Sequence, residues 1–230
     1  MRYIYCHPLF DERKCSHRFS FQLSETFRHN GLKLERFDYH GTGEAEGRFC
    51  DVTIRTLRRD IKEKIDSQKA SLIGLRLGAS LAFDYCCRQS GKVRNLVLVE
   101  PIIEGADYVD YLFRKQHIKD LMTGPSADSL EECGFHNLEG YKTNAVLIEQ
   151  IKQLCLTKMA DSLCVTGEIR IVQIIGTNRL NPQIVSLADT LKKAGVNIKV
   201  KSFKLPAFWE RIPDVDYSIL TRKILEWCRD

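Results

Sequence analysis

The chain has 230 residues, 43% of them hydrophobic, which is enough for the core of one α/β domain but not for two. Its 35 basic and 30 acidic residues are spread along the whole sequence, so the net charge of +5 gives no patch of the kind that binds nucleic acid. The nine cysteines have no CxxC spacing, which argues against a disulfide framework and a zinc site, and we expect no cofactor.

The sequence also bears on the compartment in which the protein works. The first residues lack the apolar stretch of a secretory signal, and no segment reaches the roughly 18 apolar residues that cross a bilayer. Unpaired thiols persist in a reducing environment. These features predict a cytoplasmic protein without a membrane span.

Short β-rich segments alternate with longer helical patterns in the first half of the chain. This alternation predicts a parallel sheet with helices on its faces. A helix beginning at an N-cap on Asp51 would place Ile54, Leu57, Ile61 and Ile65 on one apolar face. In chain order we expect a strand at 2–7, a polar loop at 8–14, a helix at 16–30 and a strand at 32–38. A glycine-punctuated loop at 39–47, a helix at 51–65, a strand at 71–74 and an apolar helix at 77–90 follow.

The second half begins with a strand over 95–101. The strand rhythm then stops, and residues 102–166 show helical patterns with aromatic and basic side chains, which we interpret as a cap insertion. Alternation resumes with a strand over 169–175, a helix over 182–194, a strand over 196–203 and a helix from about Asp216. The prediction is a single domain over residues 1–230 that carries this cap.

The strongest local signal lies at residues 71–80, where a buried strand, a turn flanked by Gly74 and Gly78, and a helix follow one another. Small flanking residues allow such a turn to expose its central side chain above the sheet, as in the nucleophile elbow of serine hydrolases. The central residue here is Arg76. A guanidinium stays protonated and offers no lone pair for attack, so it cannot replace a serine hydroxyl.

The other two positions of a catalytic triad lack their usual residues as well. The turn at 176–181, after the strand over 169–175, contains no carboxylate, and Phe208 stands where a histidine would follow the last strand. Loss of nucleophile, orienter and base together is more damaging than any single exchange. The sequence therefore predicts a degenerate triad.

The segments at 6–8, 38–43, 74–79, 100–105, 138–141 and 206–209 resemble the α/β-hydrolase superfamily, and within it the second exosortase-A-system-associated hydrolase family. The resemblance extends over nearly the whole chain and includes Arg76 and the Phe208-Trp209 pair. It implies a three-layer α/β-hydrolase-like fold with a mostly parallel sheet and a helical cap. The sequence departs from that family in starting almost directly at the strand over 2–7, so we expect a sheet trimmed at its N-terminal edge. The resemblance also implies a bacterial protein associated with exopolysaccharide export.

Arg76 is the central candidate for binding, because the start of a helix already favours an anion. It would anchor a carboxylate or phosphate, or it would form an ion pair with Glu100, and the two roles are compatible. Solvent exposure or core packing is the competing interpretation for most of the other candidates. The full set of ligand-binding candidates is Arg76, Glu100, His7, Leu75, Arg179, Phe208, Trp209 and His40.

Three functions remain open from the sequence. The first is binding of an anionic, acyl-bearing or sugar-containing small molecule without hydrolysis. The second is an esterase, thioesterase or acyltransferase with a non-standard nucleophile, for which Cys6 is the candidate thiol. The third is docking of a protein partner, or of a second copy of the chain, through the aromatic and basic cap.

Overall fold

The computed structural model describes residues 2–65, 69–89, 91–124, 134–174, 179–212 and 214–229. The chain divides into two compact units. The first, here called the sheet unit, comprises Met1–Phe37, Ile61–Ile103 and Leu156–Asp230. The second unit comprises Asp38–Asp60 and Glu104–Cys155.

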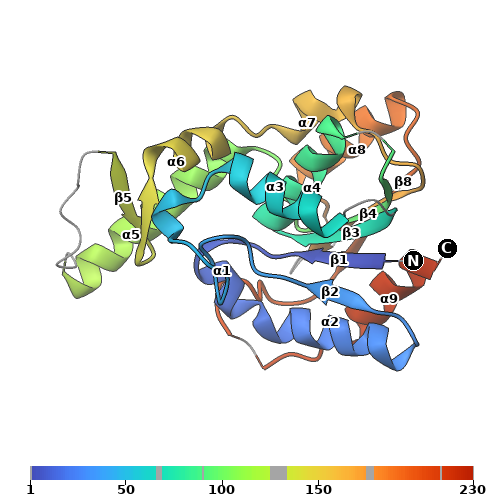
Figure 1. The fold of residues 1–230 in the computed structure, drawn as a ribbon, viewed down its shortest axis with the longest axis horizontal. Helices are drawn as coiled ribbons and strands as arrows, with labels where there is room; N and C mark the ends of the chain where they lie inside the picture. Colours follow the sequence, from blue (N-terminus) through green and yellow to red (C-terminus); the bar gives the residue numbers. More distant parts are fainter. Residues whose placement is uncertain are drawn as a thin grey trace. The chain divides into compact units, whose positions relative to one another are not determined.

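Parallel strands in the order β2-β1-β3-β4-β7-β8 form the six-stranded sheet of the sheet unit (Figure 1). Because all of them run in one direction, the loops after β1, β3 and β4 come together at one edge, where α/β proteins place their sites. The strands are β1 (Arg2–Cys6), β2 (Leu34–Arg36), β3 (Ala70–Leu75), β4 (Val93–Val99), β7 (Ile169–Ile174) and β8 (Ile198–Phe203).

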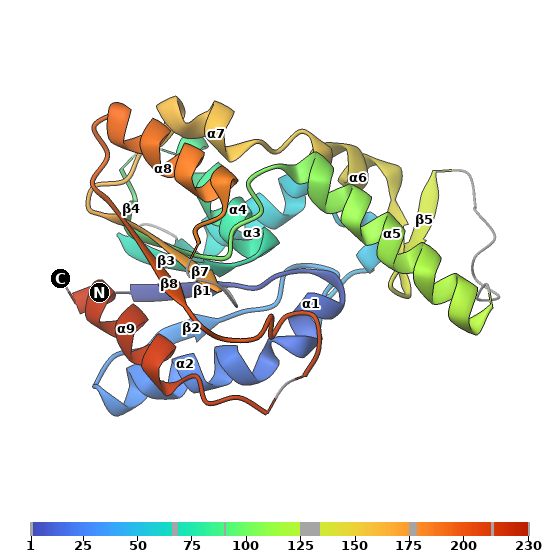
Figure 2. The same cartoon turned by 180° about the vertical axis from the view of Figure 1, so that it is seen from behind.

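Helices cover both faces of this sheet, which gives the three layers that the sequence predicts. α2 (His17–His29) and α9 (Ser218–Arg229) lie on one face, and α4 (Leu77–Arg88) and α8 (Pro182–Lys193) lie on the other (Figures 1 and 2). Two short helices, α1 (Phe10–Cys15) and α7 (Leu156–Met159), and a 3-10 helix at Ala160–Ser162 complete the unit. The predicted α/β class is confirmed.

The face under α2 and α9 holds a continuous apolar core. Phe19, Leu23 and Phe27 recur every four residues along α2, so they lie on one side of the helix and are fully buried. They pack with Leu220 and Ile224 of α9 against the side chains of the central strands. Each such burial stabilises the fold by roughly 1.5–3 kcal/mol.

The second unit is built from two separated segments of the chain. It contains a 3-10 helix at Phe49–Asp51, the start of α3 (Ile54–Ile65), α5 (Gly105–Thr123), the antiparallel hairpin of β5 (Phe135–Leu138) and β6 (Tyr141–Asn144), and α6 (Ala145–Lys152). Asn144 joins the two segments. Its Oδ1 accepts the N–H of Leu147 at 2.7 Å and so caps α6, while its Nδ2 donates to the carbonyls of Cys50 and Val52 at 2.7 and 2.8 Å.

Three local predictions need correction. The loop expected over 8–14 contains α1, because the buried Phe10 anchors a short helix there. Asp51 is not the cap of α3: it closes a 3-10 helix, and Thr53 caps α3 by exchanging hydrogen bonds of 2.9 and 3.1 Å with Thr56. The region 102–166 is not wholly helical, because it contains the β5–β6 hairpin.

The remaining expectations agree with the structure to within a few residues. The predicted apolar face of α3 is confirmed, since Ile54, Leu57, Ile61 and Ile65 are all buried. β7 and α4 end at Ile174 and Arg88, and residues 175 and 90, the predicted ends, lie outside the described residues. The expected cap at 102–166 overlaps the second unit, which also takes in Asp38–Asp60.

Candidate functional site

The turn between β3 and α4 is centred on Arg76, whose backbone has φ of 53° and ψ of −126°. A positive φ is uncommon outside glycine and costs of order 1–3 kcal/mol, so neighbouring bonds must hold it. The Arg76 N–H donates to the carbonyl of Val99 on β4 at 2.9 Å, and its carbonyl accepts the N–H of Ala79 at 3.0 Å. The turn is thus fixed to the next strand and to its own helix.

Two glycines make the close approach around this turn possible. A Cβ on Gly74 would lie 2.4 Å from the Cα of Ala79, and a Cβ on Gly78 would lie 2.3 Å from the carbonyl oxygens of Cys6 and His7. Both distances fall below ordinary contact with backbone atoms, which cannot swing away as a side-chain end can. The strand, strained turn and helix therefore have the geometry of a nucleophile elbow.

The Arg76 side chain forms an ion pair with Glu12 of α1. Its Nε donates to Glu12 Oε1 at 3.1 Å, and its Nη2 lies 3.1 Å from the same oxygen. The side chains of Arg76 and Glu12 are 14% and 1% exposed. The expected pair with Glu100 is therefore made with Glu12 instead, because α1 follows β1 and β1 is the sheet neighbour of β3.

The Trp209 ring lies against the guanidinium of Arg76. The Arg76 Cζ lies 4.9 Å from the centroid of the Trp209 ring, within the range of a cation–π contact. Phe208 points instead into the core, where its ring lies 4.9 Å from that of Phe19 and 5.0 Å from that of Tyr217. Phe208 is fully buried, so of this aromatic pair it is Trp209 that contacts Arg76.

Glu100 follows β4 and also has a positive φ, of 45°. Its N–H donates to the Val172 carbonyl at 2.7 Å, and its Oε2 accepts the N–H of Ile174 at 2.5 Å. Burial raises the pKa of the Glu100 carboxyl above its usual range, while the Ile174 hydrogen bond and the charge of Arg76 act in the opposite direction. The charge of Arg76 therefore acts on the Glu100 carboxyl, although the ion pair of Arg76 is with Glu12.

The residues at the end of β1 border the same turn. Cys6 is fully buried, and His7 is 4% exposed, with its ring 4.8 Å from the ring of Tyr5 in an edge-to-face contact. Leu75 is fully buried ahead of the turn. Ser80, a hydroxyl in the first turn of α4, donates to the Ile102 carbonyl at 2.6 Å and is fully buried, so it serves packing.

Two predicted site residues do not join this cluster. His40 belongs to the second unit, where its N–H donates to Asp60 at 2.7 Å and its ring fills the space beside Gly47. The Arg179 side chain is exposed, and its carbonyl accepts from Gln173 at 3.4 Å. Residues 176–178 of the turn predicted to lack a carboxylate lie outside the described residues.

Sequence reasoning missed Glu12. The available signal was topological, because an acidic residue shortly after one strand lies near the turn that ends its sheet neighbour. Within the described part of the chain, no group of three or more His, Cys, Asp or Glu residues could hold a metal ion. No described helix is both long and apolar enough to cross a membrane.

Comparison with solved structures identifies the architecture. The chain aligns over 99% of its length with Est1E of Butyrivibrio proteoclasticus, a structure with ferulic acid bound, covering 87% of that chain with a TM-score of 0.69 and 14% identity. It aligns over 98% with a monoacylglycerol lipase of Paleococcus ferrophilus, covering 93% of that chain with a TM-score of 0.66 and 17% identity. The chain has the α/β-hydrolase fold.

A third structure with the α/β-hydrolase fold, mouse α/β hydrolase domain-containing protein 10, covers 99% of the chain and 89% of its own length, with a TM-score of 0.61 and 16% identity. No family model matches the sequence, and no curated protein does. At these identities the similarity establishes the α/β-hydrolase fold and not an activity.

Proposed function

We propose that this α/β-hydrolase-fold protein binds a small anionic, acyl-bearing or sugar-containing molecule and does not hydrolyse it by a serine mechanism. The observation that supports this proposal is that Arg76 occupies the elbow. Arg76, at the strained turn, is tied to Glu12 and stacked on Trp209. The position that serves as nucleophile in this fold is thus a fixed cation, and Phe208 replaces the histidine.

The chemistry at the turn suits recognition of an oxygen atom. No backbone bond within the described residues uses the N–H groups of Leu77 or Gly78 at the start of α4, a place where the helix dipole favours negative charge. The Arg76 side chain keeps 14% of its surface exposed. Because Glu12 offsets much of the guanidinium charge, the site favours a carboxylate or an acyl carbonyl over a multiply charged phosphate.

The resemblance to the exosortase-associated family supports a sugar-containing ligand. Members of that family are encoded beside exopolysaccharide export systems, which is why a sugar-containing molecule stands beside anionic and acyl-bearing ones among the ligands we propose. Docking to a partner of such a system is the third function raised by the sequence.

The first test measures turnover. Purified protein should release no product above the buffer rate from p-nitrophenyl acetate, p-nitrophenyl butyrate or an acyl thioester. Arg76→Ser should remain inactive, since the new hydroxyl would have no histidine at position 208 to take its proton. Turnover that co-purifies with the protein and disappears in Cys6→Ala would overturn the proposal in favour of an enzyme with a cysteine nucleophile.

The second test measures binding through Trp209. The chain has two tryptophans, so Trp227→Phe leaves Trp209 beside Arg76 as the only one. Butyrate, methyl butyrate and glucuronate are the probes, and at least one should change the Trp209 emission saturably. The Arg76→Met/Glu12→Met double variant removes both charges together and should lose this response. A signal that none of the probes changes would contradict binding at the turn.

A further inference from the structure

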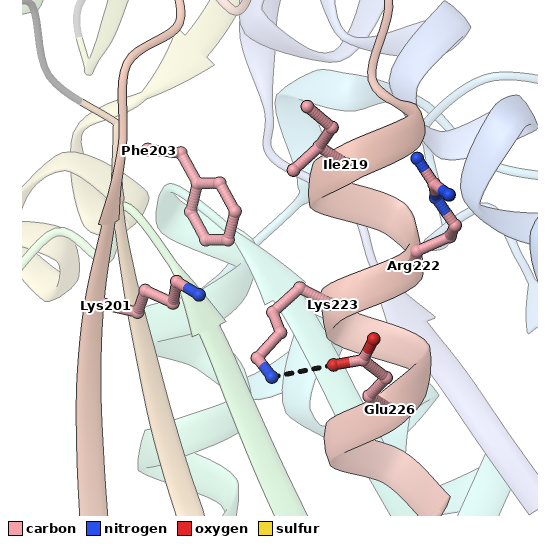
Figure 3. Close-up of a pocket in the computed structure, with 6 residues that line it drawn as sticks. All are labelled: Lys201, Phe203, Ile219, Arg222, Lys223 and Glu226. Carbon is pink, nitrogen blue, oxygen red and sulfur yellow. Dashed lines mark hydrogen bonds and ion pairs between the residues drawn. The ribbon is translucent and has the colours of Figure 1, made fainter.

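A groove of about 280 Å³ lies between β8 and α9, on the sheet unit (Figure 3). Lys201 and Phe203 reach into it from the strand, and Ile219, Arg222, Lys223 and Glu226 line it from the helix. None of these residues belongs to the elbow. Its volume lies just below the roughly 300–1,000 Å³ of pockets that hold drug-sized ligands, so it suits a small one.

The pattern of each element explains why these side chains face one another. Lys201 and Phe203 are register partners of Val172 and Ile174 on β7, which belong to the core that packs on α9, so they point to the same side of the sheet. On α9 the lining residues are spaced i, i+3, i+4 and i+7, which is one face of a helix. The groove is therefore the place where the apolar core ends at the edge strand.

The groove carries more positive than negative charge. Lys223 forms an ion pair with Glu226 at 2.7 Å, whereas neither Lys201 nor Arg222 has a carboxylate within 4.0 Å among the residues that the structure describes. The charges of all three cations lower the pKa of the Glu226 carboxyl, with the Lys223 hydrogen bond as the largest cause. The three cations thus act on the Glu226 carboxyl, and Arg222 also lowers the pKa of the Asp216 carboxyl, so these two carboxylates offset part of the positive charge.

The same groove offers apolar surface beside these cations. Ile219 is 69% exposed, and Phe203 lies under the Lys201 ammonium, whose Nζ is 5.5 Å from the ring centroid. Behind the lining, the Trp227 ring lies 5.9 Å from the Lys223 Nζ and 5.7 Å from the Cζ of the buried Arg170. Cations beside an exposed aliphatic side chain match a ligand that joins a negative head to an apolar tail.

We infer that the β8–α9 groove is a second binding site, separate from the elbow, for a small amphipathic anion with a phosphate or carboxylate head and a short alkyl or aryl tail. The head lies between Lys201 and Lys223, whose ammonium groups point into the groove (Figure 3), and the tail lies on Phe203 and Ile219. This site does not depend on the function proposed for the elbow, since the two share no residue.

Trp227 makes this inference testable. Trp209→Phe leaves Trp227 as the only tryptophan, next to Lys223. Octyl phosphate below its micellar concentration should change the Trp227 emission saturably, whereas inorganic phosphate and octyl glucoside should each bind at least about tenfold more weakly, because each lacks one half of the contact. Equal responses to octyl phosphate and octyl glucoside would overturn the anionic part of the inference.

Matched variants locate the effect. Lys201→Gln/Lys223→Gln should weaken octyl phosphate at least about tenfold, and Ile219→Asn should weaken it while leaving inorganic phosphate unchanged. Lys193→Gln, an exposed lysine on α8, is the control and should bind as the parent does. Unaltered binding in the double variant would place the ligand elsewhere and overturn the site.

A vesicle experiment separates a soluble ligand from a lipid surface. Sedimentation with phosphatidylglycerol vesicles, compared with phosphatidylcholine vesicles, reports binding to headgroups in a bilayer. The inference predicts a response to soluble octyl phosphate in the absence of any vesicle. Sedimentation with phosphatidylglycerol without such a response would overturn the small-ligand site.

Discussion

The Arg76–Glu12 pair removes two charges almost wholly from water, and the two groups depend on each other. Removal of one partner from such a pair leaves a buried charge without compensation, which typically costs about 3–5 kcal/mol, whereas apolar replacement of both partners is often close to neutral. Arg76→Ala should therefore lower the free energy of unfolding by several kcal/mol, because the buried Glu12 carboxylate loses this ion pair.

Urea unfolding of Arg76→Ala and of the Arg76→Met/Glu12→Met double variant checks this prediction. The double variant should lie much closer to the parent than Arg76→Ala does. Equal losses of stability in the two proteins would show that packing around the Trp209 ring, and not the charge on Glu12, sets the cost.

Glu100 gives a pH-dependent prediction at the same scale. Its folded-state pKa is raised, with burial as the largest cause, so the stability it contributes is full below its ordinary pKa and is lost as pH rises through the raised value. Glu100→Gln stays neutral and can still accept the Ile174 N–H. Relative to the parent, this variant should thus gain stability between about pH 4 and about pH 7 in urea unfolding. A constant difference across this range would contradict the raised pKa.

The seating of α4 on β1 gives a prediction for a whole element. Alanine is better than glycine in a helix by about 1 kcal/mol, which would make Gly78→Ala stabilising on propensity alone. A Cβ there would meet two backbone carbonyl oxygens at 2.3 Å, however, so β1 or α4 must move. Overpacking of this kind costs roughly 1–3 kcal/mol or more, and the clash should win.

Thermal unfolding compares Gly78→Ala with Gly195→Asn. Gly195 has φ of 78° and nothing within 4 Å of an added Cβ, and asparagine tolerates that backbone conformation. The Gly78 variant should melt clearly lower, and the Gly195 variant should melt near the parent. A Gly78→Ala protein as stable as the parent would show that the close approach of α4 to β1 is adjustable.

The same elements show what the sequence could and could not predict. The faces of α2 and α3 follow from three- and four-residue spacings, and the elbow follows from glycines on either side of a buried strand's end. α1 has only six residues, too few to show a helical period. The β5–β6 hairpin lies in a segment whose aromatic and basic residues we interpreted as helical. Local sequence patterns thus predicted the long helices and the elbow, but not the short helix α1 or the β5–β6 hairpin.

The sequence also predicted only part of the candidate site, because local patterns do not show which side chains meet in three dimensions. Arg76 and Trp209, both predicted to border this turn, are in contact, but Arg76 forms its ion pair with Glu12 and not with Glu100. Both carboxylates lie at the same edge of the sheet. Choosing between them depends on where α1 places its side chains, which is a matter of three-dimensional packing.

For the whole molecule, the rate at which each cysteine is alkylated distinguishes unfolding of the whole chain from local exposure of a single thiol. Cys6, Cys86 and Cys228 are buried, and burial raises the pKa of Cys86 and brings that of Cys228 to about 12, so little reactive thiolate forms there. Iodoacetamide at about pH 8, followed by peptide mass mapping, should label the half-buried Cys50 and Cys164 first. The thiols of Cys6, Cys86 and Cys228 should react only as the chain unfolds. Early labelling of Cys6 in the native protein would instead revive its candidacy as a nucleophile.

The two outer strands of the sheet have a consequence for the protein at high concentration. β2 has only three residues, and β8 presents the exposed Lys199 and Lys201. A very short edge strand and lysine side chains on an edge strand both hinder pairing with a strand of another molecule. We therefore expect concentrated solutions to stay clear, without fibrils that grow by stacking one molecule's sheet onto the next.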